Sequence, residues 1–295
     1  MAEKTVGNFE PQRYAWNADQ YALLDFGRGR KLERFGGCLL DRPSPAAVDV
    51  PSSVGVDWSQ AAARLDERGR LLAGGVPADW QARCGRLVFN LKLTPFGHLG
   101  LFPEQAANWQ WLYEQLSAWT PALAAPPRAL NLFAYTGGST MLLSAAGAEV
   151  VHVDASVPAV NWARRNAQDS GLSDRPIRWI VEDARKFVAR ELRRGNTYNV
   201  IVLDPPSYGH GPRGSARWEI ASELPELLDN CLRLLGSGPA RLLLTAHSGE
   251  YDERRVADFM NRRGPEFRLS CGRLQLGSTA TRLLDAGYFV RAARA

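Results

Sequence analysis

The segment Asp204–Tyr208 reads Asp-Pro-Pro-Ser-Tyr and follows a short apolar run, 199–203. Proline fixes φ and has no N–H, so two in a row hold the neighbouring carbonyl groups in place as free acceptors. Open α/β sheets bind ligands along the edge where their strands end. Asp204 or a carbonyl could accept a hydrogen bond from a substrate nitrogen while a planar base stacks on Tyr208, which is catalysis by orientation. The alternative is a rigid surface turn.

A second segment, Asn131–Gly138, reads Asn-Leu-Phe-Ala-Tyr-Thr-Gly-Gly and leads from an expected strand into an expected helix. Glycine lets the backbone approach a ligand closely, and the helix N-terminus offers free N–H groups. The segment is neither the Gly-x-Gly-x-x-Gly of dinucleotide enzymes nor a phosphate-binding loop. It suits a cofactor without phosphates, such as S-adenosylmethionine, or it is an ordinary tight turn.

Two acids stand at further expected strand ends. Asp154 follows the run 149–153, where a carboxylate can accept hydrogen bonds from both hydroxyls of a ribose. Ser156 is better placed than Asp154 to cap the next helix. Asp183 could accept from an adenine amino group, or it could cap the helix that begins at Ala184. His152, one residue inside its strand, is expected to be a packed side chain.

Composition sets few limits on function. The net charge is +5 and the sequence pI is about 9.2, which is compatible with an anionic partner. The four cysteines are far apart, so their spacing indicates neither a zinc site nor a disulfide framework. No metal is expected. The sequence shows no secretory leader and no apolar run of membrane-spanning length, so we expect a cytoplasmic protein that does not enter membranes.

The pattern of apolar and polar residues along the sequence changes near residues 121–127. Short apolar pieces broken by Gly, Pro and charge come before it, and they are typical of antiparallel hairpins. Strand-like and helix-like segments alternate after it, which indicates a parallel sheet. We therefore predict a small β-rich N-terminal domain over 1–102, a connecting helix and linker over 103–127, and a doubly wound α/β domain over 128–295.

The expected sheet has seven strands. Five are predicted to be parallel, at 129–133, 149–153, 177–181, 198–203 and 241–245, and an edge pair at 271–276 and 288–292 closes the sheet. Helices are expected at 103–119, 138–146, 157–170, 184–194, 218–235 and 252–263, and three of them end at a glycine (Gly147, Gly171 and Gly195).

With these strand ends placed, the chain resembles class I S-adenosylmethionine-dependent methyltransferases. It is most similar to the large-subunit ribosomal RNA methyltransferases that pair Asn-x-Phe-x-Tyr-Thr-Gly-Gly with Asp-Pro-Pro-x-Phe/Tyr, here Asn131–Gly138 and Asp204–Tyr208. The resemblance covers about residues 86–292. It implies a Rossmann-like methyltransferase sheet, S-adenosyl-L-methionine as cofactor and RNA as substrate.

The resemblance also implies which residues contact the cofactor. From the segment Leu99–Gln105, which lies over the cofactor in relatives, only Gln105 carries over. The other expected cofactor-binding residues are Tyr135, Thr136, Gly137, Gly138, Asp154, Ser156, Asp183, Ala184 and Asp204. The expected catalytic residues are Asp204, Pro205, Pro206 and Tyr208.

The sequence departs from relatives that methylate cytosine at carbon, which need a cysteine nucleophile. The two places where such relatives carry it read Thr245-Ala246-His247-Ser248 and Pro206-Ser207 here, and Cys231 is expected to lie inside a helix. The residues thus favour transfer to a base nitrogen. Protein or small-molecule acceptors stay open, as does a cofactor-holding RNA-binding protein without turnover. A nucleotide-dependent oxidoreductase on a similar sheet is disfavoured, because the third glycine is missing and two prolines follow Asp204.

Four further residues each allow two interpretations from the sequence. His247 follows the fifth expected strand and could act as a base or as a structural hydrogen-bonding residue. His210 stands in a glycine-rich stretch where it could touch substrate, and Arg213 and Arg217 could contact phosphate or be solvated. The oligomeric state is not predicted.

Overall fold

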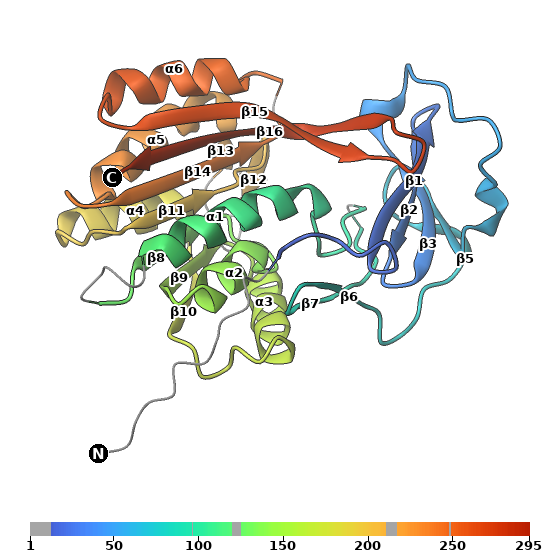
Figure 1. Cartoon of the computed structure of the whole chain (residues 1–295), viewed down its shortest axis with the longest axis horizontal. Coiled ribbons are helices and arrows are strands. Elements are labelled where there is room, and N and C mark those ends of the chain that lie inside the picture. Colours follow the sequence, from blue (N-terminus) through green and yellow to red (C-terminus); the bar gives the residue numbers. More distant parts are fainter. Residues whose placement is uncertain (1–12, 96, 120–124, 211–216, 248) are drawn as a thin grey trace.

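A mixed seven-stranded sheet forms the centre of the computed structural model, which describes residues 13–95, 97–119, 125–210, 217–247 and 249–295 (Figure 1). The strand order is β10-β9-β8-β11-β14-β16-β15. The first five are parallel to one another, and the last two run antiparallel as an edge pair, as predicted. Their bounds are Ile177–Val181, Glu149–Asp154, Arg128–Leu132, Val200–Leu203, Ala240–Ala246, Leu283–Arg294 and Arg268–Gly277.

Helices cover both faces of this sheet, which makes it doubly wound (Figure 1). Alternate residues of a strand point to opposite faces, so Ala129 belongs to one hydrophobic cluster and Leu130 to the other. The first cluster includes side chains from α1 (Ala106–Trp119), α2 (Gly138–Ala145) and α3 (Val157–Asp169). The second includes side chains from α4 (Ala184–Arg193), α5 (Ile220–Leu234) and α6 (Glu253–Arg263).

The helix ends follow from local chemistry. Gly147, Gly171 and Gly195 each lie just beyond a helix with φ between +67° and +94°, the left-handed conformation that glycine adopts without a steric penalty. At the other end, the Ser156 hydroxyl caps α3 and the Asp183 carboxylate caps α4. Among the described residues, no helix is both long and apolar enough to cross a membrane.

A second, five-stranded sheet contains β1 (Tyr21–Gly27), β2 (Arg30–Phe35), β3 (Cys38–Pro43), β4 (Ala63–Leu65) and β5 (Leu71–Gly74) in that order. All neighbours are antiparallel except β3 and β4, which are parallel. Two short 3₁₀ turns, η1 (Pro45–Ala47) and η2 (Trp58–Gln60), lie between β3 and β4. The inner face of this sheet adds Phe35 and Leu40 to the cluster that also holds α1 and α2.

The β15–β16 pair ties the two sheets together by reaching past the large sheet to β1 (Figure 1). At its tip, the Thr279 backbone N–H donates to the Leu23 carbonyl over 3.0 Å. Arg282 lies 3.1 Å from the fully buried carboxylate of Asp25. Both strands are longer, and the turn between them shorter, than the sequence predicts, because their outer halves pair with each other beyond the large sheet. The turn itself contacts β1, through the bridge between Ser278 and Leu23.

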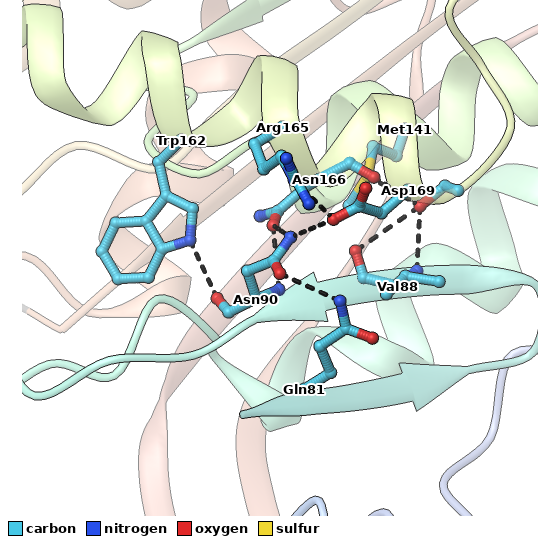
Figure 2. Close-up of polar contacts among 9 residues, drawn as sticks. Gln81, Val88, Asn90, Met141, Trp162, Arg165, Asn166 and Asp169 are labelled. Atoms are coloured by element: carbon cyan, nitrogen blue, oxygen red, sulfur yellow. Dashed lines mark hydrogen bonds and ion pairs between the residues drawn. The ribbon is translucent and has the colours of Figure 1, made fainter. Parts of the chain in front are cut away.

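A separate hairpin, β6 (Gln81–Cys84) and β7 (Leu87–Asn90), packs on α3 (Figure 2). Asn166 of α3 accepts hydrogen bonds from the backbone N–H of Asn90 over 2.9 Å and from its side chain over 3.1 Å. The Asn166 amide also donates to the Thr136 carbonyl over 3.0 Å. The indole of Trp162 donates to the Asn90 carbonyl over 2.8 Å. This junction fixes where the chain after β7 continues toward the large sheet.

Two predictions of local structure need correction. Helix α5 begins at Ile220 and not at Trp218, because Trp218 lies in a short strand, β13 (Arg217–Glu219). This strand pairs with β12 (Tyr208–His210), so His210 lies in a strand and not in the glycine-rich loop expected from the sequence. The Trp218 indole donates to the Pro206 carbonyl over 2.6 Å and holds the pair against the preceding turn. Arg213 lies outside the described residues.

We predict that Asn166→Leu lowers the free energy of unfolding by about 2–4 kcal/mol, because the Asn90 N–H and the Thr136 carbonyl both lose their partner. Arg165→Ala is the matched control on the same helix. The Arg165 side chain is 64% exposed and paired only with Asp169 among described residues, so its loss is expected to cost less than about 1 kcal/mol. Urea unfolding of both variants measures the difference, and equal losses would contradict the role given to Asn166.

Candidate functional site

A cavity of about 700 Å³ lies at the carboxyl edge of the parallel strands. The turns after β8, β9, β10, β11 and β14 each contribute lining residues. The segment 98–105, which includes the 3₁₀ turn η3 (Pro103–Gln105), covers one side. Parallel strands end at one sheet edge, so the topology brings together side chains that are more than a hundred residues apart in sequence.

The loop after β8 is backbone-strained and tightly packed. Phe133 and Tyr135 have φ of +53° and +47°, a left-handed conformation that is uncommon for aromatic residues and often accompanies a functional site. Gly137 caps α2 at φ +86° and lies against Ala163. A Cβ on Gly138 would come within 2.6 Å of the Trp109 ring, so only glycine fits there.

Asp154 projects into the cavity from the end of β9. Its carboxylate accepts backbone N–H groups from Tyr135 and Ser156, each over 2.8 Å. Burial raises the pKa of Asp154, while these two N–H groups lower it. Among the described residues, no cation lies within ion-pair distance of it, so the free lone pairs of this carboxylate are available to a ligand with hydroxyl groups.

Asp183 lines the cavity but is already engaged. It accepts the backbone N–H groups of Arg185 and Lys186 as the cap of α4, and the Arg185 guanidinium lies 2.9 Å from its second oxygen. Burial raises the pKa of Asp183, but the hydrogen bonds from Arg185 and Lys186 outweigh it and the pKa is lowered. Capping, one of the two roles open from sequence, is therefore observed.

Asp204 lies at the centre of a polar network. Its carboxylate lies 3.5 Å from the Gln105 amide nitrogen and accepts the Thr245 hydroxyl. Gln105 also donates to Thr245 over 3.2 Å. Burial raises the pKa of Asp204, and His247 nearby opposes this shift. The carboxylate at the end of β11 is thus oriented by groups from two other segments.

The orientation of Gln105 is set from outside the cavity. Arg291 of β16 donates to the oxygen of Asn108 over 2.8 and 3.1 Å, and a guanidinium can only donate. The Asn108 nitrogen must therefore face the Gln105 oxygen, 3.0 Å away. The Gln105 nitrogen is left to face Thr245 and Asp204. Because Arg291 can only donate, it fixes the orientation of the Asn108 amide, which in turn fixes that of the Gln105 amide.

The cavity includes most of the residues predicted from sequence. Gln105, Tyr135, Thr136, Gly138, Asp154, Ser156, Asp183, Ala184, Asp204, Pro205 and Pro206 line it. Gly137 and Tyr208 are not among the lining residues. Gly137 instead shapes the turn. Tyr208 is 57% exposed, because Ser207 and Gly209 face the cavity and the residue between them in the extended chain faces outward.

Sequence reasoning missed several lining residues. Phe133 and Trp218 face each other with ring centroids 4.8 Å apart, and Trp218 carried no local signal because β12–β13 pairing brings it to the cavity. His98 and Phe102 come from the covering segment. His247 lines the cavity, whereas His152 is buried and bonded to Thr140 over 2.9 Å, as expected of a packed residue. No cysteine is among the described lining residues.

The donor set suits S-adenosylmethionine on physical grounds. That cofactor carries a sulfonium and an ammonium group, and the cavity offers Asp204 with no Arg or Lys in ion-pair contact among the described residues. Asp154 provides free lone pairs for hydroxyl groups. Phe133 and Trp218 supply apolar surface for a planar ring. No Lys or Arg is among the described lining residues, so these residues offer a phosphate-bearing cofactor no cationic side chain.

Two solved structures are similar to this chain over most of its length. A crystal structure of an S-adenosylmethionine-dependent methyltransferase from Agrobacterium tumefaciens is 35% identical, with a TM-score of 0.86 over 96% of this chain and 93% of that one. A Streptococcus mutans structure is 15% identical with a TM-score of 0.69, over 94% of this chain and 76% of that one, and it shares the fold.

Curated relatives match shorter stretches. Ribosomal RNA large subunit methyltransferase K of Neisseria meningitidis is 31% identical over 39% of this chain and 32% of its own length. Methyltransferase I of Aeromonas salmonicida is 37% identical over 38% of this chain and 27% of its own length. The chain thus matches about a third or less of these relatives.

The family profile of S-adenosylmethionine-dependent methyltransferases matches residues 48–239, about two thirds of the sequence. It agrees with the resemblance expected from the two strand-end motifs, and the predicted cofactor and enzyme class are confirmed. The chain belongs to the S-adenosylmethionine-dependent methyltransferase family.

Proposed function

We propose that this enzyme transfers a methyl group to a nitrogen atom of a base in large-subunit ribosomal RNA. The observation that carries the proposal is the Asp204 carboxylate, which lines the cavity at the end of β11 together with Pro205 and Pro206. This acceptor can hold an amino or imino group in line with the methyl donor. The curated relatives named above act on ribosomal RNA of the large subunit, which supports RNA as the substrate.

The chain's thiols argue against a covalent route to a carbon atom. Cys38, Cys84 and Cys231 are buried, and burial raises the pKa of each thiol, which disfavours the reactive thiolate. Cys271 is exposed but lies on β15, away from the residues that line the cavity. Transfer by direct attack of a nitrogen lone pair needs no such nucleophile.

The cofactor is assigned to the inner part of the cavity. Asp154 is proposed to accept the ribose hydroxyls, and the backbone around Tyr135 and Thr136 to hold the amino-acid end. Asp183 and Ala184 at the start of α4, with Ser156, are proposed to border the adenine. When bound, the cofactor supplies an electrophilic methyl group, and the chain's own residues hold the acceptor in line and exclude water.

The substrate test compares nucleosides. Large-subunit ribosomal RNA from strains with and without the gene is digested and analysed by mass spectrometry. We expect one N-methylated nucleoside to be lost with the gene and restored by the wild-type protein. An unchanged RNA profile, with methyl transfer found on a protein or a small molecule, would overturn the RNA assignment.

A ribosomal RNA substrate also agrees with the cytoplasmic location expected from the sequence.

Asp154→Ala is expected to weaken S-adenosylmethionine binding by about 10- to 100-fold, because a hydrogen bond to a charged acceptor contributes about 1.5–3 kcal/mol. Isothermal calorimetry measures the change. Asp174→Ala removes an exposed acid of the same type outside the cavity and should leave the affinity as it is. Equal affinity in both variants would remove Asp154 from the cofactor site.

Asn108→Asp tests the network behind Asp204. A carboxylate at this position still pairs with Arg291 but cannot donate to Gln105, so the Gln105 amide turns its oxygen toward Asp204. We expect the transfer rate at saturating cofactor to fall about 10-fold, a change equal to one weak hydrogen bond lost. Asn230→Asp on the outer face of α5 is the matched control. A rate equal to that of the control would show that the amide order is unimportant.

Tyr208→Ala tests whether the exposed ring at the cavity rim contacts RNA. A base stacked on an aromatic ring contributes about 1–3 kcal/mol, so KM for RNA should rise 5- to 100-fold. The affinity for S-adenosylmethionine should not change, because Tyr208 does not line the cavity. Tyr208→Phe keeps the ring and should retain the wild-type KM. A parallel loss of cofactor affinity would instead give Tyr208 a structural role.

A further inference from the structure

Glu104 and His247 form a pair beside the cavity that the cofactor assignment does not use. The Glu104 carboxylate lies 3.6 Å from Nε2 of His247. Glu104 comes from the covering segment, in η3, and His247 follows β14, so they are brought together only by the fold. Among the described residues, His247 is the one side chain that pairs with this carboxylate at ion-pair distance.

The Glu104–His247 contact affects the charge on both groups, because the Glu104 carboxylate is buried. The Glu104 side chain is only 6% exposed, and a buried carboxylate without a counter-charge is costly. Burial raises the pKa of Glu104, the nearby His247 and Lys31 oppose that shift, and Asp204 adds to it. A positive charge that arises on the imidazole is therefore stabilised by a carboxylate that water does not screen well.

The imidazole is also held in place on its other side. Gly287, at φ +98°, lies so close to the ring that a Cβ there would be 2.8 Å from Nδ1. The Gly287 N–H donates to the Asp285 carboxylate over 2.8 Å, which fixes this turn. His247 keeps 46% of its side chain exposed and lines the cavity, as Asp204 does. It is fixed, yet open to a ligand.

We propose that His247 accepts the proton of the group that is methylated, and that Glu104 is the positioning residue that orients the imidazole and stabilises the imidazolium. The inference rests on the proposed function. The acceptor's lone pair forms the new nitrogen–carbon bond, the carbon–sulfur electron pair returns to sulfur, and the nitrogen–hydrogen pair stays on nitrogen as its proton moves to His247. Charge and atoms balance without a further reactant.

The other titratable groups around His247 suit this role less well. Asp204 is held by Gln105 and Thr245 and is assigned to orientation. His98 lines the cavity, but no carboxylate of the described residues pairs with it. Burial lowers the pKa of His98, which makes it a weaker base. Glu104 faces His247 from the covering segment and supplies the compensating charge.

This arrangement narrows the substrate class. A proton acceptor is needed only where the methylated atom carries a hydrogen, as an exocyclic amino group or an imide N–H of a base does. A ring nitrogen with a free lone pair and no hydrogen, such as guanine N7, would need none. The pair therefore indicates an amino or imide nitrogen as the acceptor.

The test measures single-turnover transfer from radiolabelled S-adenosylmethionine as a function of pH. The acceptors are total RNA, protein and small-molecule fractions of a strain that lacks the gene. For the wild-type protein, the rate should fall as pH is lowered, because a protonated imidazole cannot accept a proton. His247→Asn should lower the plateau rate about 100-fold and lose this acid limb, and added imidazole should restore part of the rate to His247→Ala.

Glu104→Gln keeps the shape of the side chain but removes its charge. It should lower the rate about 10-fold, with the calorimetric affinity for S-adenosylmethionine unchanged, whereas Glu104→Asp should recover part of the rate. His98→Asn is the comparison at the same cavity and should retain the acid limb.

The outcomes separate the two proposals. An acid limb that persists in His247→Asn, or a product methylated at an atom that carried no hydrogen, would overturn the proton-acceptor role alone. Transfer to the protein or small-molecule fraction would overturn the RNA assignment, and the same pH profiles would then test His247 on that acceptor. Transfer to no fraction would overturn both.

Discussion

One buried amide, Asn166, holds in register three parts of the molecule that sequence keeps apart. Its oxygen accepts from Asn90 at the end of β7, and its nitrogen donates to Thr136 in the loop after β8. The Thr136 hydroxyl in turn donates to the Gly100 carbonyl over 2.7 Å. The cofactor loop, helix α3 and the segment that covers the cavity are therefore joined by hydrogen bonds that each satisfy a polar group.

The backbone of the covering segment, residues 98–105, is tightly constrained at Gly100. Gly100 has φ +91°, and a Cβ there would lie 2.1 Å from the Trp162 ring, so the backbone rests directly on α3. A few residues later, the same segment supplies Phe102, Glu104 and Gln105. The contacts of Asn166 and Trp162 thus position side chains on the far side of the cavity, which α3 itself does not reach.

Features that depend only on residues close together in the chain can be predicted from the sequence. The succession of strands and helices, the glycines that end helices, and the acids at strand ends are local features, and Asp154, Asp183 and Asp204 were located from them. The sequence does not predict what depends on distant pairing. Trp218 reaches the cavity through a strand pair, and nothing in the local sequence distinguishes Asn166, whose partners Asn90 and Thr136 are distant along the chain. Tyr208 was placed at the cavity from its motif, but the alternation of extended chain turns it outward.

The acidic and polar side chains of the site come from two parts of the chain that meet only in the folded protein. Asp154 and Asp204 come from the sheet edge, whereas Glu104 and Gln105 come from the covering segment. Because Arg291 on β16 sets the amide order that ends at Asp204, and because the same strand pair reaches β1 through Arg282 and Asp25, the edge pair contacts both the site and the N-terminal sheet. Through this edge pair, the N-terminal sheet is linked by direct contacts to the residues that orient the Asp204 carboxylate.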